Sequence, residues 1–360
     1  MRVGIIGCGD ISVTYLKNAS GVTPFTVAAV ADLDLERASR RAREYGVERV
    51  LTPQELLAQP DIEVVLNLTV PAAHFEVSRA ALEAGKHVYG EKPLAIRRED
   101  GETLVLLASE RGLKLGSAPD TFLGAGLQTA RKLIDDGVIG RPLAATAFMM
   151  GRGPESWHPS PDFFYRPGAG PLFDMGPYYL TALISLLGPI TCVTGQAVSG
   201  HTERVITGPV RTGERIRVET PTHITGLLAF ESGAVATLIT SFDVWYAELP
   251  RIEIYGTEGT LSIPDPNTFG GPVRLRRAGE EAWREVPLTH AYATNSRGVG
   301  LRDLIEAAQQ GREPRASGRL ALHVLDAMQS ILESSEARRT LDLGSRAERP
   351  APLEALPTTV

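Results

Sequence analysis

A single lysine in a short turn motif is the strongest candidate for chemistry in this sequence. Lys92 lies in the run Gly90-Glu91-Lys92-Pro93-Leu94, directly after the apolar stretch His87-Val88-Tyr89, which predicts a strand. Pro93 disfavours helix at Lys92 and restricts the backbone there. Only five of the 37 basic residues are lysines. An ammonium is a compact charge whose pKa shifts on burial, unlike that of a guanidinium. Lys92 is therefore either a catalytic group on a rigid turn or an ordinary surface lysine before a proline.

A second candidate pair lies on a predicted apolar helix. Asp174 and Tyr178 are four residues apart, so a helix presents them on one face. An acid and a phenol in apolar surroundings require a partner or a function. Pro177 predicts a helix that starts at or just before it, which would make Asp174 its cap. Proton transfer and simple capping both fit this pattern.

A glycine turn near the start of the chain indicates a dinucleotide site. The strand-like run Arg2–Ile6 ends in Gly7-Cys8-Gly9-Asp10-Ile11, and a helical pattern follows. Gly7 permits a tight turn, and Gly9 lets a pyrophosphate approach the backbone at the helix N-terminus. Ser12 replaces the third glycine of the usual pattern.

An acidic residue at the end of the second predicted strand favours NAD. Asp32 follows the run Phe25–Ala31 and is suitably placed to accept hydrogen bonds from ribose hydroxyls. Its carboxylate would repel a 2′-phosphate, and no arginine follows immediately. We expect NAD as cofactor, with NADP possible. The alternative is that Asp32 only caps the helix Leu33–Tyr45.

Strands and helices alternate through the first third of the chain, which predicts a parallel sheet with ligands beyond its carboxyl ends. The segments Thr69–His74, Glu91–Lys92 and Ala118–Thr121 each follow a predicted strand, so we expect them to converge. His74 is equally well explained as a helix cap or packing residue. The candidate cofactor-binding residues are Gly7, Gly9, Asp10, Ile11, Asp32, Thr69, Pro71, His74, Glu91 and Lys92.

A long loop rich in Pro, Gly and aromatic residues, Gly151–Gly170, follows a strand-like segment. Loops of this length are usually functional or disordered, and aromatic content argues against disorder. We predict a pocket wall with Trp157, His158 and Tyr165 as substrate-binding residues. The same rings could instead pack the loop.

The fold class predicted is α/β. A Rossmann dinucleotide-binding domain (1–120) precedes an α+β substrate-binding and oligomerisation domain (121–345) with a large, open, mostly antiparallel sheet. Hairpin signals at 222–241 and 252–263 support the sheet, and its exposed face favours self-association. The Pro-rich tail, 346–360, is expected to be loose.

The totals exclude several classes of protein. A net charge of −6 and a pI near 5.7 do not suggest a nucleic-acid-binding surface. Two cysteines provide neither a disulfide framework nor a zinc cluster, and we expect no metal. No apolar run reaches membrane-spanning length, and the chain opens directly into a strand-like run without room for a signal peptide. We expect no membrane association and a cytoplasmic location.

The sequence resembles the glucose–fructose oxidoreductase / inositol dehydrogenase / rhizopine catabolism (Gfo/Idh/MocA) family of NAD(P)-dependent oxidoreductases. The resemblance rests on the glycine turn, Asp32, and the segments 84–95, 137–140, 168–178 and 254–259, and it spans nearly the whole chain. It implies a Rossmann domain followed by an open-sheet domain, commonly dimeric or tetrameric through that sheet. It also implies reversible oxidation of a secondary alcohol, often on a sugar, cyclitol or related polyol.

The resemblance assigns the catalytic roles to Lys92, Asp174 and Tyr178. The family's lysine corresponds to Lys92, and its Asp-x-x-x-His pair corresponds to Asp174 and Tyr178. Tyrosine thus stands where histidine is usual, as it does in sugar- and dihydrodiol-oxidising members. An ammonium near a phenol favours the phenolate, so Lys92 and Tyr178 suit a proton relay.

Two other functions stay open at this point. A non-catalytic regulatory sensor would bind dinucleotide and sugar without turnover, and a redox-assisted glycosidase would release a sugar without net reduction of NAD. Both occur among the family's relatives. Absorbance of the reduced nicotinamide separates a dehydrogenase from either alternative.

Overall fold

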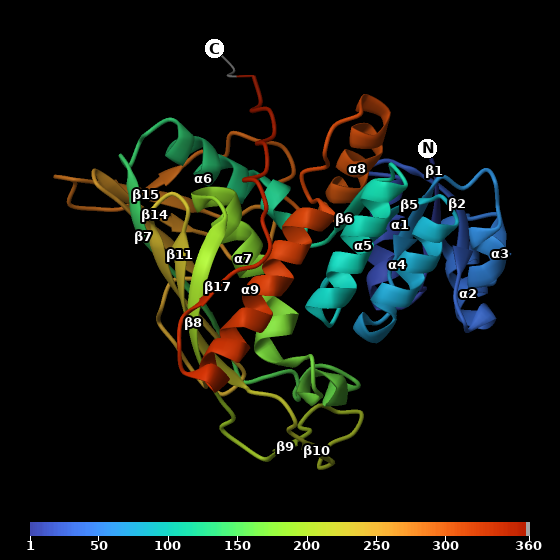
Figure 1. Cartoon of the computed structure of the whole chain (residues 1–360), viewed down its shortest axis with the longest axis horizontal. Coiled ribbons are helices and arrows are strands. Elements are labelled where there is room, and N and C mark those ends of the chain that lie inside the picture. Colours follow the sequence, from blue (N-terminus) through green and yellow to red (C-terminus); the bar gives the residue numbers. More distant parts are fainter. Residues whose placement is uncertain (358–360) are drawn as a thin grey trace. The chain divides into compact units, whose positions relative to one another are not determined.

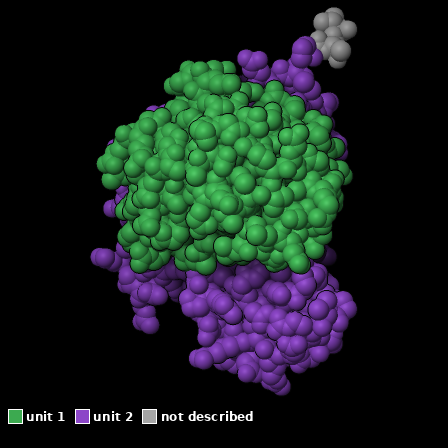
Figure 2. Space-filling model, turned by 90° about the vertical axis from the view of Figure 1, so that its right-hand side faces the viewer, with its two compact units in different colours: residues 1–124, 292–325 green, residues 125–291, 326–360 purple. Residues whose placement is uncertain are grey.

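The computed structural model describes residues 1–357, which form two compact units (Figures 1 and 2). Unit 1 consists of Met1–Gly124 and Tyr292–Leu325, and unit 2 consists of Ala125–Ala291 and the chain from Asp326 onward. The observed division falls after Gly124, where we expected it after residue 120. Residues 292–325, which we assigned to the second domain, belong to unit 1.

Unit 1 is built on a six-stranded sheet in the order β3-β2-β1-β4-β5-β6, with every neighbouring pair parallel. Its Val- and Ile-rich strands are largely buried, as expected for a parallel sheet covered by helices. The strands are β1 (Arg2–Ile6), β2 (Thr26–Ala31), β3 (Arg49–Leu51), β4 (Val64–Asn67), β5 (His87–Gly90) and β6 (Leu115–Ser117). This confirms the predicted Rossmann fold.

The helices of unit 1 alternate with these strands along the chain (Figure 1). They are α1 (Asp10–Ala19), α2 (Leu35–Tyr45), α3 (Pro53–Leu57), η1 (Pro71–Ala73), α4 (His74–Glu83), α5 (Arg98–Glu110), η2 (Thr121–Leu123) and α8 (Val299–Gln310). The strand order reverses between β1 and β4, and this switch point is where such sheets bind ligands. The cofactor region is therefore at the carboxyl ends of β1 and β4.

Unit 2 is built on a nine-stranded sheet in the order β16-β15-β14-β13-β7-β12-β11-β8-β17. Only β7 and β12 pair in parallel, which confirms the predicted mostly antiparallel sheet. Its strands are β7 (Pro142–Met150), β8 (Ile190–Val198), β11 (His223–Phe230), β12 (Val235–Ser241), β13 (Ile252–Gly256), β14 (Gly259–Ile263), β15 (Val273–Arg277), β16 (Arg284–Val286) and β17 (Leu341–Asp342). A separate two-stranded sheet joins β9 (Glu203–Val205) to β10 (Arg215–Arg217).

Helices pack against one face of this large sheet (Figure 1). They include α6 (Ala125–Asp135) and α7 (Gly170–Leu187), while α9 (Gly318–Ala337) begins in unit 1 and ends in unit 2. Strand residues alternate between buried and partly exposed, and Leu227 and Val235 are 56% and 54% exposed. The face that carries these two residues is therefore open in the single chain.

The segment after β17 is held by hydrogen bonds, although we expected a loose tail. Arg349 donates to the carbonyl oxygens of Ser185 (2.9 Å) and Leu186 (2.6 Å), which lie at the C-terminal end of α7. These carbonyls have no partner within the helix, so a guanidinium satisfies them well. Leu353 N also donates to the side chain of Gln128 at 2.7 Å. Sequence composition did not reveal these contacts.

A buried carboxylate ties the end of β6 to α8 within unit 1. The Asp120 carboxylate accepts hydrogen bonds from the backbone N–H groups of Gly298 (2.8 Å) and Gly300 (3.0 Å), and Asp120 is 1% exposed. These donors lie at the N-terminal end of α8, where backbone N–H groups lack helical partners. Burial raises the pKa of Asp120 from 3.8 to about 6, and Glu91 adds to the rise.

We expect Asp120 to make unfolding pH-dependent. Its folded pKa is raised, so its stabilising contribution is present below pH 3.8 and is lost as the pH rises through about 6. Asp120→Asn keeps an acceptor oxygen and removes the ionisation. Between pH 4 and 8 the melting temperature should therefore fall more in the parent than in the variant, by an amount equivalent to at most about 3 kcal/mol. Parallel melting curves would contradict this expectation, and the exposed Asp136→Asn serves as control.

Candidate active site

The glycine turn after β1 leaves space over the start of α1. Gly7 has φ +102°, and a Cβ there would lie 2.6 Å from the backbone of Leu68, so only glycine fits. A Cβ on Gly9 would meet nothing within 4 Å. The Ser12 hydroxyl, at the third position of the pattern, donates to the carbonyl of Gly9 at 2.6 Å. The first backbone N–H groups of α1 thus border open space suited to a pyrophosphate.

Asp32 at the end of β2 is fixed by two backbone donors. Cys8 N donates to Oδ2 at 2.7 Å, and Asp34 N donates to Oδ1 at 2.9 Å. The cap of α2 is Asp34, which accepts from Arg37 N, so the capping explanation for Asp32 is wrong. Arg37 also places its guanidinium 3.7 Å from Oδ1 of Asp32. The carboxylate is thereby oriented beside the glycine turn, as ribose binding requires.

The turn after β4 is organised by Asn67, which the sequence did not single out. Its side chain donates to the carbonyl of His74 and accepts from both the backbone and the hydroxyl of Thr69, the latter at 2.6 Å. His74 is 2% exposed, with ring nitrogens 2.7 Å from the carbonyl oxygen of Pro93 and 3.0 Å from that of Thr69. Burial lowers the pKa of His74, and the contacts with the two carbonyl oxygens oppose this shift. The His74 ring therefore links two turns: the one that contains Thr69 and Pro71, and the one at Pro93.

The turn after β5 carries the candidate lysine. Glu91 N donates to the carbonyl of Asn67 at 2.9 Å, and the Glu91 carboxylate accepts from the Tyr15 hydroxyl at 2.9 Å. Lys92 follows at the carboxyl end of the sheet, and the Lys92–Pro93 peptide bond is cis. Ala118 N donates to the carbonyl of Gly90 at 2.8 Å. The predicted convergence of the segments after β4, β5 and β6 is therefore confirmed.

In unit 2, Asp174 and Tyr178 both lie inside α7. The helix begins at Gly170-Pro171 and contains Pro177, so the expected start near Pro177 and the capping role of Asp174 are wrong. Pro171 fits the first turn, where a missing N–H costs nothing, and this explains the earlier start. The two side chains share a face as predicted, with Tyr178 buried at 6% exposure and Asp174 partly exposed.

The loop 151–169 contains η3 (Pro161–Tyr165) and an aromatic cluster. Trp157 is 67% exposed. The centroid of the His158 ring lies 5.4 Å from that of Trp157 and 5.1 Å from that of Phe164. Ser160 N donates to Nδ1 of His158 at 3.0 Å, so a neutral ring carries its proton on Nε2. Trp157 and His158 are thus accessible for binding. Tyr165 is completely buried and donates to Glu155 at 2.7 Å, so it supports the loop.

Comparison with known proteins gives two family matches. The Oxidoreductase family, NAD-binding Rossmann fold, matches residues 1–118, and the GFO/IDH/MocA C-terminal domain matches residues 127–262. The chain belongs to the GFO/IDH/MocA family of oxidoreductases. The resemblance, the NAD-binding Rossmann domain and the classification as an oxidoreductase are thereby confirmed.

Relatives in the GFO/IDH/MocA family match along most of their length. A dTDP-3,4-didehydro-2,6-dideoxy-alpha-D-glucose 3-reductase from Streptomyces antibioticus is 31% identical, covering 91% of this chain and 93% of the relative. A 1,5-anhydro-D-fructose reductase from Ensifer adhaerens is 30% identical, and the match covers 88% of this chain and 91% of the relative. The solved structure of a levoglucosan dehydrogenase in complex with NADH has a TM-score of 0.81 at 21% identity. The match covers 96% of this chain and 99% of that chain, and it supports the fold.

Two kinds of feature are absent from the described residues 1–357. That part of the chain contains no group of three or more His, Cys, Asp or Glu residues arranged to hold a metal ion. It also contains no helix long and apolar enough to span a membrane.

Proposed function

We propose that this protein uses NAD to oxidise a secondary hydroxyl of a sugar, cyclitol or related polyol, or to reduce the corresponding ketone. The observation that carries the proposal is the edge of the unit 1 sheet, where the open start of α1, the oriented Asp32 carboxylate and Lys92 occur together. The printed names of the relatives, a sugar reductase and an anhydrofructose reductase, support a carbohydrate substrate.

The residues present fit NAD. The turn Gly7 to Ile11 would receive the pyrophosphate, and Asp32 would accept the ribose hydroxyls. We assign cofactor contacts also to Asp10, Thr69, Pro71 and Glu91, with His74 acting through the backbone it holds. When bound, NAD supplies a hydride acceptor.

The remaining tasks fall to protein side chains. We propose that Lys92 binds the reacting oxygen with its ammonium, that Tyr178 accepts or returns the hydroxyl proton, and that Asp174 orients a substrate hydroxyl. Trp157 and His158 would contact the sugar ring, since an aromatic face packs on apolar C–H groups and an imidazole bonds a hydroxyl. Tyr165 would act only by supporting this loop.

A substrate screen tests the proposal directly. Sugars, cyclitols and dihydrodiols are incubated with NAD or NADP while absorbance of the reduced nicotinamide is followed. Net reduction of NAD by at least one secondary alcohol is expected. Binding without turnover would favour a sensor, and release of a sugar without net reduction would favour a redox-assisted glycosidase.

We expect the double variant Asp32→Ser/Leu33→Arg to prefer NADP. Removing the carboxylate ends its repulsion of a 2′-phosphate, and Arg37, within 3.7 Å of Asp32, gains freedom to bind it. Leu33 is 91% exposed, so an arginine there costs little stability. The ratio of kcat/KM for the two cofactors measures the change. Leu33→Arg alone is the control and should still prefer NAD; a parent enzyme that already prefers NADP would refute our assignment of Asp32.

We expect Trp157→Ala and His158→Ala to raise KM or alter substrate choice more than they alter stability. Each removed contact is worth about 1 kcal/mol, or roughly a fivefold rise in KM. Trp157 is mostly exposed and His158 is partly exposed, so their loss removes little buried packing. Tyr165→Phe is the contrasting variant, because it removes the bond to Glu155 and should lower the melting temperature instead. Unchanged KM across the whole substrate screen would reject the pocket-wall assignment.

We also propose that the protein is a homodimer or homotetramer formed through the open face of the unit 2 sheet. The exposed Leu227 and Val235 on this face support the proposal. Light scattering on the purified protein gives the number of subunits, and a monomer would reject the proposed assembly.

Both cysteines, Cys8 and Cys192, are free, which supports the cytoplasmic location we propose.

A further inference from the structure

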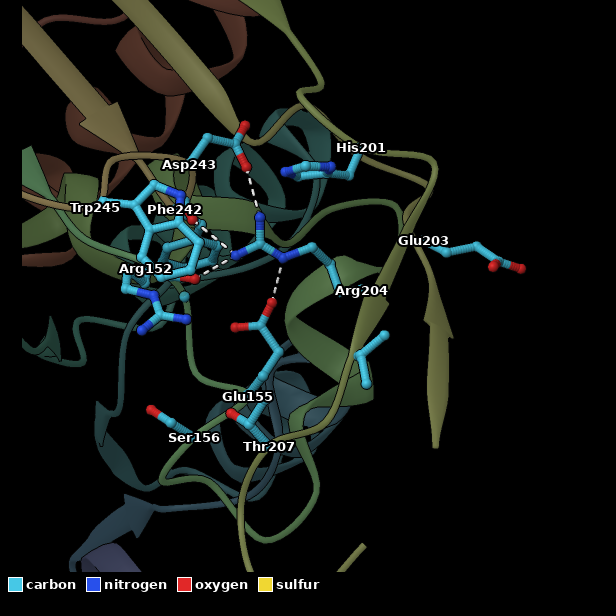
Figure 3. Close-up of a pocket in the computed structure, with 12 residues that line it drawn as sticks. Arg152, Glu155, Ser156, His201, Glu203, Arg204, Thr207, Phe242, Asp243 and Trp245 are labelled. Carbon is cyan, nitrogen blue, oxygen red and sulfur yellow. Dashed lines mark hydrogen bonds and ion pairs between the residues drawn. The ribbon is translucent and has the colours of Figure 1, made fainter. Parts of the chain in front are cut away.

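A cavity of about 310 Å³ lies within unit 2, and no residue assigned above to cofactor, substrate or catalysis lines it (Figure 3). It is lined by three segments: the start of the loop after β7, residues 201–207 around β9, and the segment that follows β12. Neither Asp174 nor Tyr178 lines it, and neither Trp157 nor His158 does. Its size falls at the lower end of small-molecule sites.

The wall of this cavity is held rigid by Arg204. Its guanidinium donates to the Glu155 carboxylate, to Asp243 at 2.8 Å and to the carbonyls of Phe242 (2.9 Å) and Arg152. Figure 3 shows these bonds radiating from one central side chain. Charge-assisted bonds in a partly desolvated place fix geometry strongly. Arg204 therefore joins all three segments and has little capacity left for a ligand.

Several polar side chains around the cavity are exposed. They are the hydroxyl-bearing Ser156 and Thr207 and the imidazole of His201. The Arg152 guanidinium forms no ion pair within the described residues 1–357; it lies 3.5 Å from the centre of the Trp245 ring. A ligand in the cavity would thus meet four exposed side chains that carry hydrogen-bond donors or acceptors.

The charges of the lining favour a neutral ligand. Arg152 and Arg204 balance Glu155 and Asp243, and Glu203 forms an ion pair with Arg215 at 2.8 Å. Both bonds to the Glu155 carboxylate, from Arg204 and Tyr165, go to Oε1. Oε2 remains as an acceptor, and Figure 3 shows it pointing away from Arg204. A carboxylate oxygen repels an anion but accepts a hydroxyl group.

The aromatic rim adds a surface for the ring of such a ligand. Trp245 is 62% exposed, although tryptophan usually buries most of its area. Aromatic faces pack on apolar C–H groups while polar neighbours bond hydroxyls. We propose that this cavity is a second carbohydrate site, which binds a neutral monosaccharide or cyclitol through Ser156, Thr207, His201 and Glu155 with Trp245 at its rim. The site does not depend on NAD.

Tryptophan fluorescence tests the proposal on the full chain. The protein has three tryptophans, so Trp157→Phe/Trp283→Phe leaves Trp245 as the only reporter and removes any signal from the loop 151–169. Without NAD, titration with D-glucose, myo-inositol and 1,5-anhydroglucitol should give a saturable change for at least one ligand. Thr207→Val, which keeps shape and loses the hydroxyl, should weaken binding about threefold to tenfold. Thr237→Val, on the open sheet face, is the matched control and should have no effect.

Several outcomes would overturn the inference. These are the absence of a saturable signal with all three neutral ligands, tighter binding of inorganic phosphate or glucuronate than of the neutral rings, and an unchanged affinity in Thr207→Val. Should the double tryptophan variant fail to fold, saturation-transfer NMR on the unmodified chain and on Trp245→Ala replaces the fluorescence readout. Because NAD is absent, failure here leaves the proposed hydride transfer untouched, and turnover assays test that separately.

Discussion

Replacing Tyr178 by phenylalanine should lower kcat by about 10²–10⁴-fold with only a modest change in KM, the range typical for loss of a general acid or base. The substitution keeps the ring that α7 buries and removes only the hydroxyl, so the fold should survive. Asp174 lies one helical turn before Tyr178 on the same face, which is the arrangement of the catalytic pair in the resemblance. Stopped-flow measurement of NADH formation separates the chemical step from product release.

The pH–rate profile supplies an independent readout for Tyr178. Its basic limb should be flattened or displaced in Tyr178→Phe, since the titrating phenol is gone. Tyr179→Phe, one position along the same helix, is the matched control and should retain activity. If Tyr178→Phe is nearly as active as the parent while His158→Ala is inactive, the proton carrier is His158.

Lys92→Met should reduce kcat by about 10³-fold or more while NAD binding, measured by calorimetry, changes little. Loss of one electrostatic donor at a reacting oxygen typically costs 10²–10³-fold, and the ammonium can also take part in proton transfer. Methionine keeps much of the length and apolar stem of the side chain. The neighbouring turn is held by Glu91, His74 and backbone bonds, so it should keep its shape.

Two further variants make the Lys92 experiment specific. Lys92→Arg retains the positive charge but not the compact ammonium, and we expect only partial activity. Lys17→Met removes an exposed lysine on α1 and should behave as the parent. Near-normal kcat in Lys92→Met would remove Lys92 from the catalytic machinery, whereas joint loss of NAD affinity and stability would indicate a structural role.

The first unit could be predicted in detail because its signals are local. Strands β1 and β2 are apolar runs followed directly by Gly7 and Asp32, and Lys92 lies just beyond β5; parallel strands bring these carboxyl ends together. The sequence therefore predicts that Gly7, Asp32 and Lys92 lie at one edge of the sheet. It could not supply Asn67, because a single asparagine at a strand end carries no sequence signal for the turn it organises.

Long-range contacts account for the rest. The start of α7 was misjudged because Pro177 suggested a helix boundary, whereas Gly170-Pro171 provides the actual one. Residues 292–325 join unit 1 through partners such as Asp120, and Arg349 attaches the tail to α7. The cavity near Arg204 combines three segments distant in sequence, so no pattern along the chain pointed to it.

The bond between Asp120 and α8 has a consequence for how the protein is made. Asp120 and Gly298 are 178 residues apart, and nearly all of the intervening chain belongs to unit 2. A ribosome adding about 5–20 residues per second needs roughly 10–35 s to pass from one partner to the other. During that interval the nascent first unit lacks α8. The Asp120 carboxylate therefore lacks its two hydrogen-bond donors, the backbone N–H groups of Gly298 and Gly300. The N-terminal unit, although translated first, is therefore expected to reach its complete fold only after most of the second unit has emerged.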